Sequence, residues 1–160
     1  MGVLDRYRRT KVAKERAGEP LGFDDRPRPA RGAARILELA LHKPVERGGQ
    51  QGLEVVFRVQ AHELEGAKVV LEVSLHEQGK GPLKSRVPGL ADALGNLSVF
   101  DLFIPERDEP VEVERRAFFP FAAIEVALAG PLKCFARVLA LESQRGELAV
   151  EEVAFTLEAG

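Results

Sequence analysis

The chain has 160 residues, of which 45% are hydrophobic, and its formal net charge is −2 at pH 7. These values fit one globular domain with a tail and exclude a chain that is disordered throughout. The single cysteine, Cys134, excludes an internal disulfide, so we expect an intracellular, cytoplasmic location. No stretch approaches the roughly 18 apolar residues of a membrane-spanning helix, and the N-terminal residues lack the apolar run of a secretory signal.

Charge is unevenly distributed along the chain. Residues 1–35 contain ten Lys or Arg against five Asp or Glu, whereas residues 36–160 contain 13 against 20. Residues 1–34 have few apolar side chains, and Pro20, Pro27 and Pro29 favour an extended path. We therefore predict a basic arm over residues 1–34 that becomes ordered on a partner. Its predicted partner-binding residues are Leu4, Arg6, Tyr7, Arg8, Arg9 and Val12.

From residue 35 onward the apolar residues alternate with polar ones, which is typical of half-buried antiparallel strands. The pattern predicts strands over 37–41, 53–62 and 67–77. The link between the second and third of these is short and contains Gly66, so we expect those two strands to form a hairpin. A long connection follows over 78–95, in which 91–94 is expected to form one helical turn.

Strands are predicted again over 97–104, 111–117, 132–142 and 148–157. The last two are separated by a short link ending in Gly146, which predicts a hairpin. About seven short strands without intervening helices indicate an all-β fold, an antiparallel β-sandwich of the immunoglobulin or C2 type, over residues 35–160. Phe57, Leu71, Val73, Val138 and Phe155 are expected in its core.

The segment from Phe118 to Val126, followed by Gly130, the alternating strand 132–138 and the last strand, resembles the end of an uncharacterised bacterial β-sandwich accessory domain. The resemblance covers residues 35–158 and consists mainly of apolar spacing. The chain departs from that pattern at Phe121, where the family often has tyrosine. The resemblance implies an immunoglobulin/C2-like fold and a non-catalytic module. Of Phe119 and Phe121, we expect one inside the core and the other at an interface with a partner.

No cluster of residues predicts catalysis or metal binding. His42, His62 and His76 are interpreted as solvated strand residues. His62 and His76 lie at outward-facing positions of the expected hairpin, which separates them too far to share a zinc ion. Cys134 shares the parity of apolar neighbours and is expected to be buried. The carboxylates of 106–114 are interpreted as a solvated edge, and Asp92, Asn96, Asp101 and Asp108 as too scattered for a calcium site. We therefore expect no enzyme, no cofactor and no metal site.

Two functions remain open from the sequence. The first is a non-catalytic interaction or assembly subunit, whose arm tethers the sandwich to a protein partner or to a second copy of the chain. The alternative is a ligand-binding sandwich for a small molecule, a carbohydrate or an acidic membrane surface. Nucleic acid is not an expected partner, because the body is acidic and its few aromatic residues are expected in the core.

Overall fold

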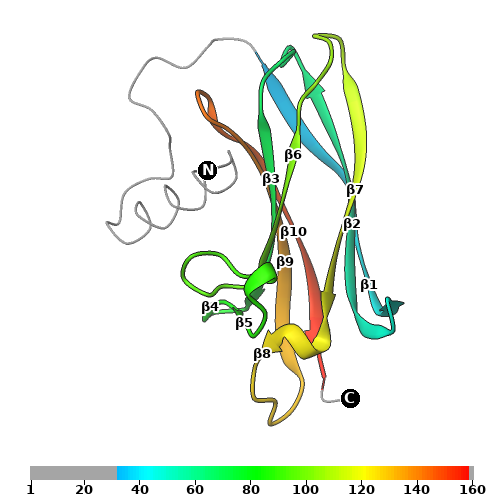
Figure 1. Ribbon diagram of the computed structural model, residues 1–160, viewed down its shortest axis with the longest axis vertical. Coiled ribbons are helices and arrows are strands. Elements are labelled where there is room, and N and C mark those ends of the chain that lie inside the picture. The colour runs from blue at the N-terminus through cyan, green and yellow to red at the C-terminus, as the bar shows by residue number, and fades with distance from the viewer. Residues whose placement is uncertain (1–31, 159–160) are drawn as a thin grey trace.

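The computed structural model describes residues 32–158, and the predicted arm up to residue 31 lies outside this range. The chain forms an antiparallel β-sandwich, in which two sheets face each other along the long axis of the molecule (Figure 1). Seven strands are six residues or longer, as the sequence predicted. They are β1 (Ala33–Arg47), β2 (Gln50–His62), β3 (Val69–Glu77), β6 (Ser98–Phe103), β7 (Val111–Pro120), β9 (Leu132–Glu142) and β10 (Gly146–Leu157).

The smaller of the two sheets has three strands in the order β1-β2-β7. The central strand β2 directs Leu53, Val55, Phe57, Val59 and Ala61 into the sandwich, and all five are buried. Strand β1 departs from regular pairing between Leu37 and Ala40, where Glu38 adopts a φ of 54°. This bulge bends the long first strand over the edge of the core.

The larger sheet has five strands. Strands β10, β9 and β3 lie side by side in that order, and β6 and the short β4 (Gly81–Pro82) both pair with the edge of β3 that faces away from β9. Strand β3 is central, and eight of its nine residues are buried on both faces. The predicted hairpin between the last two strands is confirmed, since β9 and β10 pair along their whole length. A two-stranded element, β5 (Lys84–Ser85) with β8 (Ile124–Glu125), lies at one end of the sandwich.

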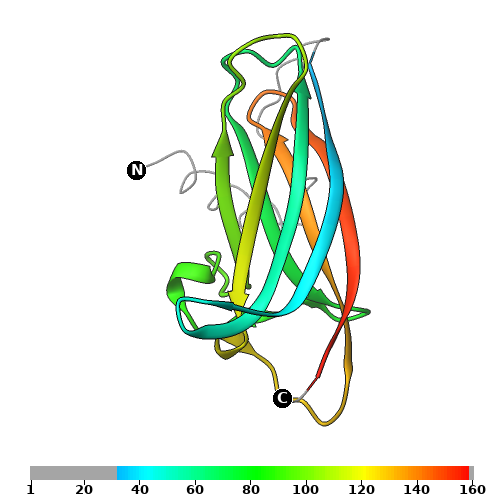
Figure 2. The ribbon, with the colours of Figure 1, turned by 90° about the vertical axis from the view of Figure 1, so that its right-hand side faces the viewer.

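The expected core residues are all buried: Phe57, Leu71, Val73, Val138 and Phe155. Each points inward because inward and outward side chains alternate along a strand. The two sheets also meet at both edges. Strand β1 lies along β10 on one side (Figure 2), and Arg115 of β7 forms an ion pair of 2.7 Å with Asp101 of β6 on the other.

The hairpin expected between 53–62 and 67–77 is wrong. Strand β2 pairs with β1 and β7, whereas β3 pairs with β9, β6 and β4. The link 63–66 crosses from one sheet to the other, and its amides bond to the neighbouring β6–β7 link, from Glu63 to the Asp108 carbonyl and from Gly66 to the Pro105 carbonyl. A short link with glycine suits either path, so only the pairing of the strands decides between them.

Two smaller features complete the fold. The helical turn expected at 91–94 is displaced, since the 3-10 turns lie at Pro88–Leu90 and Phe121–Ala123. Across residues 32–158, no helix has the length and apolar character needed to span a membrane.

Candidate ligand-binding cleft

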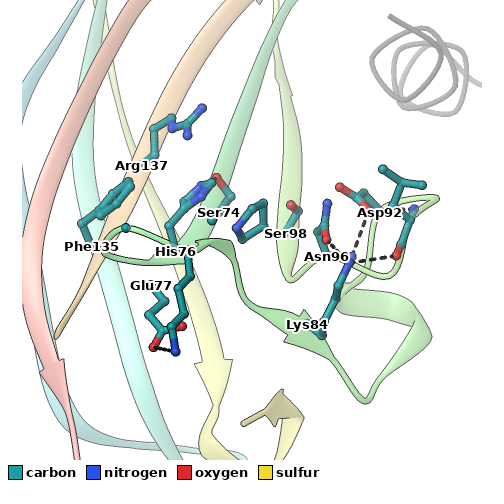
Figure 3. Close-up of a pocket in the computed structure, with 14 residues that line it drawn as sticks. Ser74, His76, Glu77, Lys84, Asp92, Asn96, Ser98, Phe135 and Arg137 are labelled. Carbon is teal, nitrogen blue, oxygen red and sulfur yellow. Dashed lines mark hydrogen bonds and ion pairs between the residues drawn. The ribbon is translucent and has the colours of Figure 1, made fainter. Parts of the chain in front are cut away.

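A polar cleft of about 770 Å³ opens on the outer face of the five-stranded sheet, near β4 (Figure 3). Its floor comes from β3, β6 and β9, and its walls come from the turn after β3 and from the loop 92–98. Figure 3 shows the strand residues Arg137, Phe135, His76 and Ser74 on one side, and Asp92, Asn96 and Lys84 on the other.

The strand side of the cleft is built from neighbouring rungs of the sheet. Ser74 and His76 occupy alternate positions of β3, so both point to the outer face. In the register of the sheet, Ser74 lies between Ser98 of β6 and Arg137 of β9. His76 lies beside Phe135, and their rings stack with centroids 4.9 Å apart and an interplanar angle of 4°.

Hydrogen bonding fixes His76 from a second direction. Its Nε2 lies 2.8 Å from the Ser74 hydroxyl, and both residues are buried. The imidazole is therefore held in one orientation by a ring face and by a hydroxyl. The buried ring forms part of the floor of the cleft.

The loop side of the cleft is an ordered polar turn. The Oδ1 of Asp92 accepts hydrogen bonds from the amides of Leu94 (2.9 Å) and Asn96 (3.0 Å). This arrangement, in which a carboxylate closes its own turn, is common for Asp in loops. Lys84 of β5 donates to Asn96 Oδ1 at 2.7 Å, so an ammonium group is held at the same rim.

Two buried polar atoms in the cleft have hydrogen-bonding capacity left over. Asp92 is 7% exposed and Ser98 is 1% exposed. Within the described residues, Asp92 Oδ2 and Ser98 Oγ have no hydrogen-bond partner. Buried polar atoms in folded proteins are nearly always satisfied, because an unmade hydrogen bond costs about 1–3 kcal/mol. One acceptor and one hydroxyl are thus available to a molecule in the cleft.

The interpretation of all three histidines as solvated residues is wrong for His76. His42 and His62 are exposed, on β1 and at the end of β2. His76 is buried because its strand is central and because Phe135 covers its ring. The available signal was the alternation of Ser74 and His76 within an otherwise apolar strand, which places two polar groups on one face.

Cys134 is buried on the inner face of β9, as predicted. Burial, with a smaller contribution from the nearby Glu77 carboxylate, raises the pKa of its thiol to about 11. A thiol of that pKa is roughly 0.1% thiolate at pH 8, and the thiolate is the form that reacts.

We therefore expect Cys134 to resist alkylation in the folded protein. Iodoacetamide at pH 8 should modify it at least about 100-fold more slowly than in the urea-unfolded chain, where its pKa returns to an ordinary value. Mass spectrometry of timed aliquots measures both rates. Equal rates would mean that the thiol is accessible in the native state.

The acidic residues that the sequence analysis considered for calcium are dispersed in the described part of the chain. Within residues 32–158, no three His, Cys, Asp or Glu side chains gather in a geometry that could hold a metal ion. The loop brings Asp92 and Asn96 together, but Asp101 pairs with Arg115, and Asp108 accepts the amide of Glu65 at 3.1 Å. The carboxylates at 106–114 are exposed.

Of the predicted partner-binding residues, the structure describes only Phe119 and Phe121. Leu4, Arg6, Tyr7, Arg8, Arg9 and Val12 lie outside the described residues. Phe119 is fully buried and forms part of the main core, so it offers no surface to a partner. Phe121 is half-buried and lines a separate hollow of about 300 Å³ near the end of β10. The structure therefore places Phe119 inside and leaves Phe121 as the partly accessible member of the pair.

Comparisons with known proteins include a structural neighbour of low similarity. No protein-family model matches the chain, and no curated protein matches it. Among solved structures, the chain is similar to the Pseudomonas fluorescens alkylpurine DNA glycosylase AlkC bound to DNA containing an abasic site analog, with 12% identity and a TM-score of 0.37. The similarity covers 79% of this chain and 31% of that chain, so the chain spans about a third of the neighbour's length.

This finding corrects one prediction. The sequence predicted that the protein is not an enzyme, whereas the neighbour is an enzyme chain. We therefore withdraw that prediction. A TM-score of 0.37 assigns neither an activity nor a substrate to this chain.

Proposed function

We propose that the protein is a ligand-binding β-sandwich module and that the cleft binds a small hydroxylated organic anion, such as an acidic sugar. The observation that carries this proposal is the pair of buried, unsatisfied polar atoms, Asp92 Oδ2 and Ser98 Oγ. Binding sites place a few convergent polar groups in a concave surface. A ligand hydroxyl that donates to Asp92 and a ligand oxygen that accepts from Ser98 would satisfy both atoms.

The charges in the cleft favour an anion. Three cationic side chains line it, Lys80, Lys84 and Arg137, against the carboxylates of Glu77 and Asp92. Lys80 lies 3.7 Å from Glu77, which balances that pair. Arg137 projects from the floor, with its Nε 3.7 Å from Glu152, and a guanidinium can bind a carboxylate or phosphate through two parallel hydrogen bonds.

The aromatic rings favour a ligand with a flat apolar face. Phe135 and His76 form one stacked surface beside Arg137. A sugar ring combines such a face with hydroxyl groups and, in acidic sugars, with one anionic group. This corresponds to the second of the two functions that the sequence left open. The first, assembly through the arm, stays a prediction, as does a cytoplasmic location.

The test is a titration of the full chain, labelled with ¹⁵N, with glucuronate, glucose 6-phosphate, inorganic phosphate and glucose. We expect the first two to shift amide signals around Ser74, His76 and Ser98, with a Kd near 1 mM or tighter, which corresponds to about −4 kcal/mol. Neutral glucose and inorganic phosphate should bind more weakly, because each lacks one half of the recognised chemistry.

Arg137→Gln should weaken binding of glucuronate about tenfold or more, since a hydrogen bond to a charged group contributes about 1.5–3 kcal/mol. The matched control is Arg35→Gln, on the outer face of the three-stranded sheet, where Arg35 bonds only to exposed Gln60 among the described residues. It should leave binding unchanged. Signals that do not move with either acidic sugar, or equal losses in the two variants, would contradict the proposal.

A further inference from the structure

A serine and a histidine form a hydrogen-bonded pair at the floor of the cleft. Ser74 Oγ lies 2.8 Å from His76 Nε2, and both side chains line the cleft. The strand fixes the pair, because residues two apart in a strand project from the same face. With the imidazole proton on Nδ1, Nε2 accepts the hydrogen bond from the Ser74 hydroxyl. In this arrangement a histidine can take the hydroxyl proton and activate the oxygen as a nucleophile.

The stacked ring of Phe135 restrains the histidine of this pair. Its ring is almost parallel to the imidazole, at 4°, and belongs to the neighbouring strand β9. Rotation of the imidazole about its bond to Cβ would break this contact, so Nε2 stays directed at the serine oxygen. A general base has to be held within hydrogen-bonding distance of the proton that it takes.

Two hydrogen-bond donors flank Ser74 in the sheet. The register places it between Ser98 of β6 and Arg137 of β9 (Figure 3). Among the described residues, neither Ser98 Oγ nor Arg137 Nε has a hydrogen-bond partner, and the 3.7 Å from Arg137 Nε to Glu152 is too long for a hydrogen bond. Side chains opposite each other on neighbouring strands have Cβ atoms roughly 4.5–5.5 Å apart. A hydroxyl and a guanidinium N–H therefore lie on the two sides of the serine.

Acyl transfer to a serine requires these parts together. The reaction needs a hydroxyl with a base in contact, and donors beside it for the negative charge that develops on the carbonyl oxygen. The cleft contains the first in Ser74 and His76 and the second in Ser98 and Arg137. The guanidinium has five N–H groups, so its terminal nitrogens stay available for the anionic group of the ligand.

We propose that the cleft hydrolyses a carboxylic ester, with Ser74 as the nucleophile and His76 as the general base. Ser74 Oγ bonds to the carbonyl carbon while His76 Nε2 takes the hydroxyl proton. The bond from that carbon to the alkoxy oxygen then breaks, and His76 gives its proton to the departing alcohol. A water molecule attacks the acyl-serine in the same way. It loses a proton to His76, the bond to Ser74 Oγ breaks, and that proton returns to the serine as the carboxylic acid leaves.

The ligand proposed above supplies the alcohol of this ester. An acidic sugar has several hydroxyl groups, and an acyl group on one of them is an ester. The ligand oxygen that accepts from Ser98 is then the carbonyl oxygen of the acyl group. A cleft of about 770 Å³ is in the range of sites for drug-sized ligands, roughly 300–1,000 Å³, so it has room for a sugar with a short acyl chain. The choice of alcohol rests on the proposed function, whereas the chemistry at Ser74 does not.

The first test is labelling of the full chain with a small fluorophosphonate, which bonds to activated serine oxygens with loss of fluoride. The chain has four serines, Ser74, Ser85, Ser98 and Ser143. We expect label on Ser74, which is the one serine of the tryptic peptide 69–80, in the folded protein and not in the urea-unfolded chain. Mass spectrometry of the digest locates the label. Absence of label on that peptide, or equal labelling of the folded and unfolded chains, would overturn the proposal.

The second test is the turnover of 4-nitrophenyl acetate. Ser74→Ala should reduce the rate to that of buffer, and His76→Gln should lower kcat/KM about 100-fold or more, because general base catalysis contributes about 10²–10⁴-fold. The matched control is Ser143→Ala, at an exposed position of the β9–β10 turn outside the cleft, which should leave the rate unchanged. Circular dichroism checks that each variant is folded. A folded Ser74→Ala protein with the rate of the control variant would contradict the assigned nucleophile.

The two proposals for the cleft fail in different ways. Amide shifts with glucuronate but no label on Ser74 would overturn the hydrolysis alone. Label on Ser74 without shifts from either acidic sugar would contradict the proposed ligand and leave the hydrolysis standing. Release of acetate, followed by NMR, should be about tenfold or more faster from O-acetylated glucuronate than from O-acetylated glucose, since a hydrogen bond to a charged group is the stronger kind. Equal rates would overturn the choice of alcohol.

Discussion

Replacing Phe57 with alanine should lower the free energy of unfolding by about 3–5 kcal/mol, because it empties a site in a close-packed core. Phe57 is among the largest fully buried side chains and lies on the central strand β2, between β1 and β7. Single domains are stable by about 5–15 kcal/mol in total. The variant should therefore unfold at much lower urea concentration, and part of it should be unfolded without denaturant.

The control for this prediction is the neighbouring residue. Val56 lies on the opposite face of β2 and is half-buried, so Val56→Ala should cost about 1 kcal/mol or less. Urea melts followed by circular dichroism measure both variants. A smaller loss at position 57 than at position 56 would mean that the inner and outer faces of β2 are reversed.

Replacing Gly52 with alanine should destabilise the protein by about 1–3 kcal/mol or prevent folding, because the site has no room for a side chain. Gly52 is paired with Pro120 across β2 and β7. A Cβ at this position would collide with the carbonyl oxygen of Phe119 and lie 2.8 Å from the Cα of Pro120. Both of these atoms are backbone, so β7 would have to shift.

Gly89 provides the matched control. An added Cβ there meets nothing within 4 Å, and its φ lies outside the left-handed region. Gly89→Ala should therefore change the free energy of unfolding by no more than about 0.5 kcal/mol. Thermal melts of the two variants make the comparison, and a Gly52→Ala protein as stable as Gly89→Ala would show that β2 and β7 are less closely paired at this end.

The positions of the strands and of the core residues could be predicted from the periodicity of the sequence. Alternation of apolar and polar residues located the seven longer strands, and the inward parity of Phe57, Val138 and Phe155 placed them in the core. The Gly146 turn identified the β9–β10 hairpin. The same reasoning failed between β2 and β3, because a short link with glycine can close a hairpin or cross between sheets. The choice depends on pairing with strands distant in sequence.

The candidate site depended more on tertiary structure. Lys84, Asp92 and Ser98 lie in or beside the long connection, for which the sequence predicted only a displaced helical turn, and only the closing of that loop against β3 brings them to Ser74 and His76. Alternation could not show that the outer face of β3 is buried, because alternation reports one buried face and this strand has two. For the same reason, the sequence did not predict that Val70, Leu139 and Leu141 are buried on the outer face of the sheet.

The sequence by itself therefore determined the all-β class, the approximate positions of the seven longer strands and the inner core, because these depend on local alternation of side chains. It also determined the opposite charges of the N-terminal part and the body. The tertiary structure alone decided which strands are neighbours, which outward side chains are covered and which polar groups share a cleft. Those properties depend on contacts between residues far apart in the chain, and a local pattern contains no information on them.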